Sequence, residues 1–224
     1  MKPEALKISN LQIQVARMTE AKPVLLFLAA LVLSGCRSYF KPSARPADYY
    51  YLNHNKNLTS IGTVAIVELD NRSSYPEVSS DVTEALFQAL QKKQVFGLAV
   101  VRQQEPSWRS LQLDQDSVYT LDQLAAIRRT LRCNAILTGT ITQYQPYPHM
   151  VIAMRLKLLD LTDGQLAWAL EQVWDSGDKT TEIRIKDYFQ KQKRQGFAPI
   201  REQLAVISPI EFLKFVTYEV AETL

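Results

Sequence analysis

The chain has 224 residues, of which 46% are hydrophobic and 22% are charged, the balance of an ordinary globular protein. Its formal net charge is +3, and the part from Cys36 onward carries 22 basic and 21 acidic residues, a net charge of +1. Each phosphate that a nucleic-acid-binding protein neutralises requires a lysine or an arginine. A near-neutral domain therefore argues against nucleic acid as the partner.

An unbroken apolar run of ten residues, 24–33, dominates the start of the chain. A helix needs about 20 residues to cross a membrane, so this run is too short for a permanent span. With Lys22 before it and small residues after it, the run has the length of the apolar core of a secretion signal. Met18 begins a leader of more usual length than Met1 does, so two starts remain open and residues 1–17 are a candidate over-extended start.

Leu33-Ser34-Gly35-Cys36 closes the apolar run and resembles the bacterial lipobox, in which the signal peptidase cleaves before the cysteine and the thiol carries a diacylglycerol. The alternative is a buried core helix that ends in Ser-Gly-Cys by chance. Two or more acyl chains hold a protein on a membrane almost permanently. We therefore predict that residues 1–35 are a lipoprotein signal peptide and that Cys36 is the lipidation site.

The residue after this cysteine bears on location. By resemblance to lipoprotein sorting rules, Arg37 is not the aspartate that retains lipoproteins in the inner membrane. The sequence therefore favours a lipid-anchored protein at the periplasmic face of the outer membrane.

Residues 36–59 show no helix or strand period and contain Pro42 and Pro46, a pattern typical of a tether between a lipid and a domain. The same segment contains three consecutive tyrosines, and a tether seldom needs three in a row. They are therefore candidate partner-binding side chains: Tyr49, Tyr50 and Tyr51.

From residue 60 the chain first alternates strands with helices. Residues 61–69 form an apolar, β-branched run, which is typical of a strand covered on both faces. Asp81 and Glu84 have the spacing of a capping box and predict the start of a helix. The elements expected here are a strand at 61–69, a helix at about 81–93, a strand at 96–101 and a helix opening at Thr120.

The second half of the domain predicts three strands and a helix. Asp163-Gly164 lies between two alternating runs, which predicts a hairpin with a primed turn. Ser208 and Pro209 have the residue types of an N-cap and a first helical position. The expected elements are strands at 133–142, 150–159 and 166–174 and a helix from Ser208, with the buried stripe Leu213, Val216, Val220 and Leu224.

The element order is strand-helix-strand-helix-strand-strand-strand-helix. It predicts a single α/β domain over residues 60–224, with a mixed β-sheet of about five strands packed by helices. A helical insertion is expected near residues 178–207, where basic and apolar residues interleave. A chain of this length can bury roughly 70% of its unfolded surface.

Two interpretations of this insertion remain open. It could present a surface to a partner or to anionic envelope polymers. Alternatively, it is an amphipathic helix with its apolar face on the sheet. The composition favours this second interpretation. Under the first interpretation the candidate partner-binding residues are Tyr188, Phe189, Lys191 and Arg194.

No constellation in the sequence points to catalysis. His54 and His149 have no metal-ligand spacing, and the serines lack a Gly-x-Ser-x-Gly context. Cys133 opens a predicted strand and is interpreted as a small buried hydrophobe rather than a disulfide partner. Turn chemistry explains Asp70 and Asp160 at strand ends as well as catalysis does. We expect no enzymatic activity, no metal and no cofactor.

Three segments carry a resemblance to a known family: VAIVELDNRS at 64–73, CNAILTGTI at 133–141 and LKLLD at 156–160. Together they resemble the CsgG/PelC/LpoB-type bacterial lipoproteins, whose domain is akin to the amino-terminal domain of TolB. The resemblance covers roughly residues 60–175. It implies assistance in curli secretion, exopolysaccharide export or peptidoglycan synthesis, and no catalytic residues. The charged helical segment 178–207 departs from the curli channel, so no transmembrane pore is expected.

These observations favour a non-catalytic accessory or assembly component of an envelope export or cell-wall-building machine. It would act through the membrane-bound lipid and through an envelope protein partner or self-association. The alternative is a periplasmic hydrolase or a sugar-binding enzyme subunit. A pocket with convergent carboxylates would favour the enzyme, and an exposed apolar or aromatic patch would favour an interaction module.

Overall fold

The computed structural model describes residues 49–113, 118–194 and 208–224, all of which belong to the compact unit Ala44–Leu224. The predicted signal peptide, Cys36 and most of the predicted tether lie outside the described residues. None of the helices in the described ranges combines the length and the apolar character that a membrane span requires.

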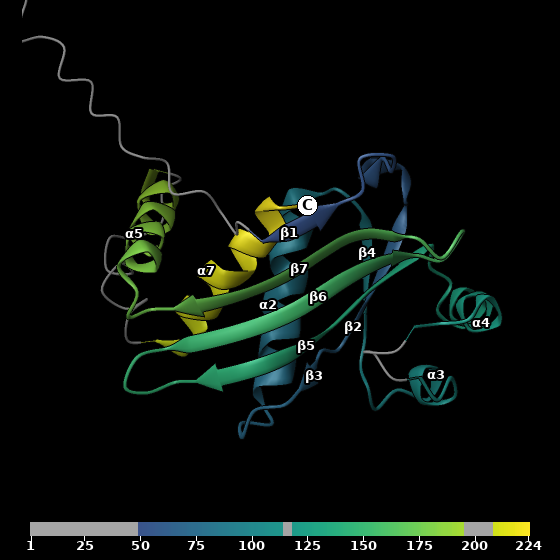
Figure 1. The fold of residues 1–224 in the computed structure, drawn as a ribbon, viewed down its shortest axis with the longest axis horizontal. Helices are drawn as coiled ribbons and strands as arrows, with labels where there is room; N and C mark the ends of the chain where they lie inside the picture. The colour runs from purple at the N-terminus through teal and green to yellow at the C-terminus, as the bar shows by residue number, and fades with distance from the viewer. Residues whose placement is uncertain (1–48, 114–117, 195–207) are drawn as a thin grey trace, which may run out of the picture. The chain divides into compact units, whose positions relative to one another are not determined.

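Among the described residues, seven strands form one mixed sheet in the order β1-β7-β6-β5-β2-β4, with the short β3 beside β5 (Figure 1). β2 pairs in parallel with β4 and β5, and β5, β6, β7 and β1 pair antiparallel. The strands are β1 (Tyr50–Leu52), β2 (Thr63–Val67), β3 (Asp70–Asn71), β4 (Gly97–Val101), β5 (Ala135–Gln145), β6 (Val151–Asp160) and β7 (Leu166–Asp175). The predicted α/β class is confirmed. The sheet exceeds the expected five strands because β1 and β3 are too short to show a period.

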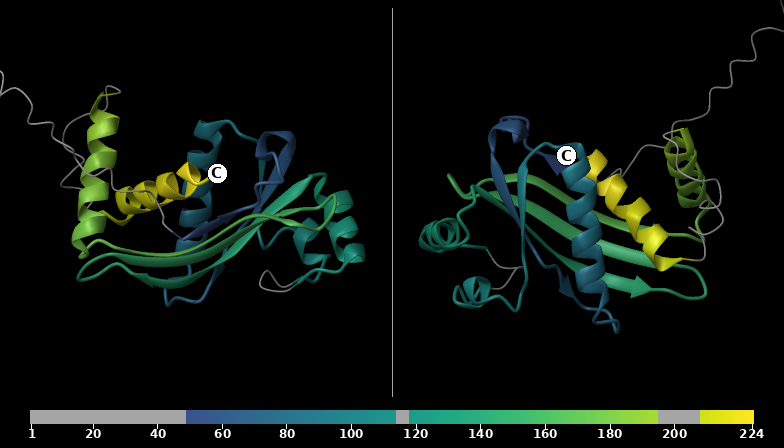
Figure 2. Two further views of the ribbon diagram at one scale, coloured as in Figure 1. Left: turned by 45° about the horizontal axis from the view of Figure 1, so that its top comes forward. Right: turned by 180° about the vertical axis from the view of Figure 1, so that it is seen from behind.

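The helices divide between the two faces of the sheet (Figure 2). α2 (Val78–Lys93) and α7 (Pro209–Glu222) pack on one face, and α5 (Lys179–Arg194) packs beside α7. α3 (Pro106–Arg109) and α4 (Leu121–Leu131) cover the other face near β2 and β4. A 3-10 turn, η1 (Leu58–Ser60), precedes β2.

β2 shows why its run is continuously apolar. Val64 and Ile66 face the core under α2, whereas Ala65 and Val67 face the second core under α4. All four side chains are fully buried. The prediction of a strand covered on both faces is confirmed. Cys133 lies in the second core as an unbridged thiol with 2% of its surface exposed, as predicted.

α7 is buried far beyond its predicted stripe. Leu213, Val216 and Val220 are buried as expected, but Phe212 and Phe215 are buried as well. The reason is that α7 contacts the sheet, α2 and α5 on different sides, so more than one face is covered.

The capping predictions met with different outcomes. The predicted helix start at Thr120 is confirmed: its hydroxyl accepts a bond from Gln123 N–H and its own N–H donates to the Gln123 side chain, which forms a capping box. α2 instead begins at Val78, so Asp81 and Glu84 lie inside the helix and do not cap it. Burial of Val78 extends the helix beyond the predicted start. Ser208 occupies the N-cap position of α7, but its side chain accepts no capping hydrogen bond.

The described part of the predicted tether belongs to the folded domain, which corrects the prediction. Tyr50 lies opposite Leu170 in the β1–β7 pairing, and Leu58 is buried. Lys56 Nζ lies 2.6 Å from Asp160 Oδ2 and 2.5 Å from Asp163 Oδ2. Strand pairing at a sheet edge needs backbone groups rather than an apolar period, so the sequence pattern did not reveal it.

The β6–β7 turn also differs from the prediction. Gly164 has the expected positive φ, +73°, but Asp163 does not have the positive φ that a type I′ turn would need. The loop between the strands has five residues, 161–165, and Asp160 N–H donates to Gln165 O at 3.0 Å across it. Burial of Leu161 in the second core, where its N–H bonds Asn134 O, explains the longer loop.

Candidate functional site

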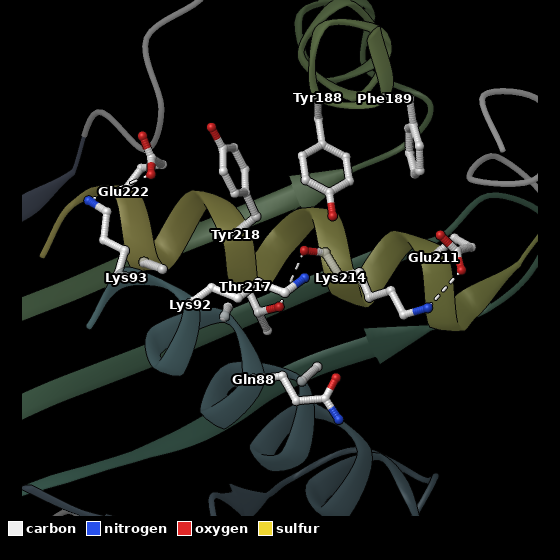
Figure 3. Close-up of a pocket in the computed structure, with 13 residues that line it drawn as sticks. Gln88, Lys92, Lys93, Tyr188, Phe189, Glu211, Lys214, Thr217, Tyr218 and Glu222 are labelled. Atoms are coloured by element: carbon white, nitrogen blue, oxygen red, sulfur yellow. Dashed lines mark hydrogen bonds and ion pairs between the residues drawn. The ribbon is translucent and has the colours of Figure 1, made fainter. Parts of the chain in front are cut away.

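A groove of about 600 Å³ lies between α2 and α7, with side chains of α5 along one wall (Figure 3). Its walls combine aromatic rings, lysines and carboxylates from three helices. The polar and aromatic residues that line the groove are Gln88, Lys92 and Lys93 of α2, Tyr188 and Phe189 of α5, and Glu211, Lys214, Thr217, Tyr218 and Glu222 of α7.

The aromatic wall forms where α5 meets α7. The Tyr188 ring centroid lies 4.8 Å from that of Phe189 and 4.8 Å from that of Tyr218. Burial raises the pKa of the Tyr218 phenol, and the nearby charges of Glu222 and Glu219 raise it further. The phenol therefore stays neutral and can donate a hydrogen bond across the physiological range.

The interpretation of the insertion as a surface with exposed aromatic anchors is wrong for Tyr188 and Phe189. Their exposed fractions are 9% and 3%, so most of their area packs inside the molecule. The amphipathic-helix interpretation describes α5 better, although its apolar side packs mainly on α7. α5 packs there because aromatic side chains of α7 contact its apolar side. The ring centroids of Tyr188 and Phe215, for example, lie 5.9 Å apart.

The charges of the groove are three lysines and two glutamates. Lys214 Nζ lies 2.8 Å from Glu211 Oε1, and Lys93 Nζ lies 3.6 Å from Glu222 Oε1. Lys92 takes part in no ion pair among the described residues. The groove therefore has a net charge of +1 beside an aromatic wall, which suits a ligand that combines carboxylate and apolar groups.

The carboxylates of the groove do not converge. Glu211 and Glu222 are eleven residues apart on α7, which corresponds to about 16 Å along a helix. Paired catalytic carboxylates of glycoside hydrolases lie about 5–10 Å apart. Within the described ranges, no three His, Cys, Asp or Glu side chains gather in a way that could hold a metal ion.

The other predicted site residues lie elsewhere. Tyr49, Tyr50 and Tyr51 are 77%, 46% and 50% exposed at the β1 edge and do not line the groove. Tyr49 instead borders a separate hollow of about 310 Å³ with residues of β5, β6 and β7. Lys191 is exposed on α5. Arg194 ends α5, but its side chain lies outside the described residues, as does Cys36.

Apart from Tyr188 and Phe189, the sequence did not identify the residues of the groove, among them Lys92, Lys214 and Tyr218. Lys214 and Tyr218 are four residues apart, so they share a side of α7 that the predicted apolar stripe left unassigned. That spacing was a visible signal. Nothing in the sequence indicated that the end of α2 lies alongside α7.

No protein-family model matches this sequence, and no curated protein matches it significantly. Among solved structures it is similar to a PelC dodecamer from Paraburkholderia phytofirmans, with 13% identity over 60% of this chain and 85% of that chain (TM-score 0.40). The LpoB C-terminal domain from Salmonella enterica is 23% identical over 50% of this chain and 82% of its own (TM-score 0.37). Lipoprotein GNA1162 from Neisseria meningitidis is 11% identical over 59% and 99% (TM-score 0.42). Likenesses of this size are too weak to transfer a function.

Proposed function

We propose that this chain is a lipid-anchored accessory protein of the bacterial envelope, which binds a partner protein in the α2–α7 groove and catalyses no reaction. In this proposal Cys36 carries the lipid and holds the domain at the periplasmic face of the outer membrane. The lipobox-like sequence Leu33–Cys36 supports the anchor, and Arg37 supports the outer membrane.

The observation that carries the proposal is the composition of the groove. Half-buried Tyr218, backed by the buried ring of Tyr188, supplies aromatic surface, and Lys92 supplies an ammonium group that no described carboxylate neutralises. Aromatic side chains provide much of the binding energy of protein interfaces, and a charge at the rim selects the partner. The matching ligand is a protein segment with apolar and acidic side chains.

The accessory role follows from the anchor together with the groove. A lipid confines the protein to one surface and raises its effective concentration toward a partner there, so a weak groove contact suffices. Such a protein fits an envelope export or cell-wall-building machine as an assembly component. The alternative, a periplasmic hydrolase or a sugar-binding enzyme subunit, would need convergent carboxylates, and those of this groove are about 16 Å apart along α7.

The test is photo-cross-linking in living bacteria with a photoreactive residue in place of Gln88, which is exposed and lines the groove. We expect a cross-linked envelope protein. Lys92→Glu in the same chain should reduce its yield about tenfold, because reversal of the rim charge repels an acidic segment. Arg129→Glu is the matched control, since it reverses another exposed basic residue in the last turn of α4.

Two results would contradict the proposal. Absence of any cross-link at Gln88 above the background of the unmodified chain would mean that the groove is unoccupied. Equal losses with Lys92→Glu and Arg129→Glu would mean that net charge, rather than the groove, governs the interaction.

A further inference from the structure

The sheet ends at β4, and no described strand pairs with its outer edge. β4 contains no charged residue and no proline over Gly97–Val101. Gly97 and Ala99 are exposed, while Leu98 and Val100 are half-buried. Proteins usually protect an edge strand with charges, prolines or bulges, because its unpaired backbone groups can pair with another strand. β4 has none of these protections.

The backbone of β4 faces β2 at every second residue. Gly97 N–H donates to Gly62 O at 2.9 Å, and Val101 O accepts from Glu68 N–H at 2.8 Å. Since backbone groups alternate along a strand, residues 97, 99 and 101 bond to β2 and the groups of Leu98 and Val100 point outward. Each outward residue offers one N–H donor and one C=O acceptor.

We propose that β4 pairs antiparallel with β4 of a second copy of this chain, with Ala99 opposite Ala99. In this register Leu98 of each copy exchanges both backbone bonds with Val100 of the other. The four resulting hydrogen bonds use every outward donor and acceptor of the two strands, so the edge is complementary to itself. Ala99 and its counterpart form the pair without hydrogen bonds, where side chains approach most closely, and alanine is small enough to fit.

Charge decides the direction of pairing. Near the C-terminal end of β4, Arg102 is surrounded by three carboxylates: Glu68 at 3.9 Å, Glu84 at 3.5 Å, and Glu105, which accepts from Arg102 N–H at 2.8 Å. Antiparallel pairing places these acidic ends of the two copies at opposite ends of the paired strands. Parallel pairing would place them side by side, where like charges repel.

This interface goes beyond the proposed function, and no residue of β4 lines the groove. The side of α2 next to β4 contains Ser80 and Glu84, both of which contact Arg102. Gln88, which lines the groove, donates from Nε2 to Glu84 Oε1 at 3.1 Å, so the groove lies one helical turn further along the same side of α2. The two sites therefore adjoin on α2 without sharing a lining residue.

The test is disulfide trapping in the full chain, in the bacterial envelope. Across an antiparallel pair without hydrogen bonds, Cα atoms lie about 4.5 Å apart, a distance that a disulfide accepts. Ala99→Cys should therefore yield a disulfide-linked dimer on mild oxidation. Gly97→Cys is the matched control on the same edge, because in this register Gly97 and its counterpart lie about 13 Å apart along the strands. We expect at least ten times more dimer from Ala99→Cys, and none from the unmodified chain.

A second variant tests the hydrogen bonds. In Ala99→Cys chains, Val100→Pro removes an outward donor without breaking a bond to β2 and should abolish the dimer, whereas Val100→Thr should preserve it. The melting temperature checks that Val100→Pro folds; if it does not, the comparison of Ala99→Cys with Gly97→Cys decides alone. Equal dimer from those two variants, no dimer from Ala99→Cys, or a product with a different protein would overturn the proposal.

Discussion

The indole Nε1 of Trp174 donates a 2.7 Å hydrogen bond to Oε2 of Glu219, and both side chains are buried. The other oxygen of this carboxylate lies 3.3 Å from Nε of Arg184. One carboxylate therefore joins β7, α7 and α5, the elements that hold the aromatic wall of the groove in place. A buried charge of this kind is costly to leave unpaired.

We expect Glu219→Ala to lower the free energy of unfolding by about 3–5 kcal/mol, because it strands the nearly buried guanidinium of Arg184 and the indole N–H of Trp174. Urea denaturation at neutral pH measures the change. Glu222→Ala is the control: its ion pair with Lys93 is partly exposed and contributes about 0–1 kcal/mol. Similar losses for both variants would show that the buried carboxylate has no special role.

Gly164 provides a test of backbone strain. Its φ is +73°, and a Cβ there would lie 2.8 Å from Leu124 Cδ1. We expect Gly164→Ala to lower the free energy of unfolding by about 1–3 kcal/mol. Gly97→Ala, at an exposed glycine without a positive φ where a Cβ would meet its nearest neighbour at an ordinary 3.4 Å, should change it by less than about 0.5 kcal/mol. An unchanged melting temperature for Gly164→Ala would contradict the loop conformation.

The Lys56–Asp160 pair predicts a pH dependence. Partial burial favours a higher pKa for Asp160, but hydrogen bonds from Lys56 and Thr162 and the charge of Lys56 outweigh it and hold the pKa below its usual 3.8. A lowered folded-state pKa stabilises the fold above pH 3.8, and this contribution is lost as the pH falls through the lower value.

Lys56→Met should remove most of that contribution. We expect the variant to unfold about 1–2 kcal/mol more easily at pH 7 and the difference from the unmodified chain to shrink below about pH 4. Urea unfolding from pH 7 to pH 2 measures it, with the exposed Lys179→Met as control. A difference that stays constant over this range would rule out the electrostatic explanation.

The Cys133 thiol should be unreactive in the folded domain. Burial raises its pKa, and backbone hydrogen bonds offset this in part, so little thiolate forms near neutral pH. In a Cys36→Ser chain, where Cys133 is the remaining cysteine, a thiol reagent should react at least about 100-fold more slowly in buffer than in concentrated urea. Equal rates would place the thiol at the surface.

The proposed lipid anchor gives a prediction that is independent of the fold. Cys36→Ser should leave an unprocessed or soluble protein, because the thiol proposed to accept the lipid is absent. Metabolic labelling with a palmitate analogue measures the modification, and Cys133→Ser should be labelled like the unmodified chain. Equal labelling of Cys36→Ser would refute the lipobox interpretation.

Features with a local physical cause were predictable from the sequence. The run at 61–69 indicated a strand between two cores because both of its faces are apolar. The capping box at Thr120 was recognisable because its two residues lie three apart. Gly164 was identified because few other residues adopt a positive φ. Each signal requires only neighbours in the chain, so a sequence pattern contains all of it.

Only the tertiary structure decided which residues form the groove and which edges of the sheet are open. β1 joins the sheet through a partner strand more than 100 residues away, and Lys56 finds Asp160 at a separation of 104. The prediction of Tyr188 as an exposed anchor was wrong because its burial depends on contacts with α7, which follows later in the chain. The periodicity of a helix shows that one side is apolar, but it does not identify the element that covers that side. Long-range packing makes that choice, because it depends on which apolar surfaces meet when the whole chain folds.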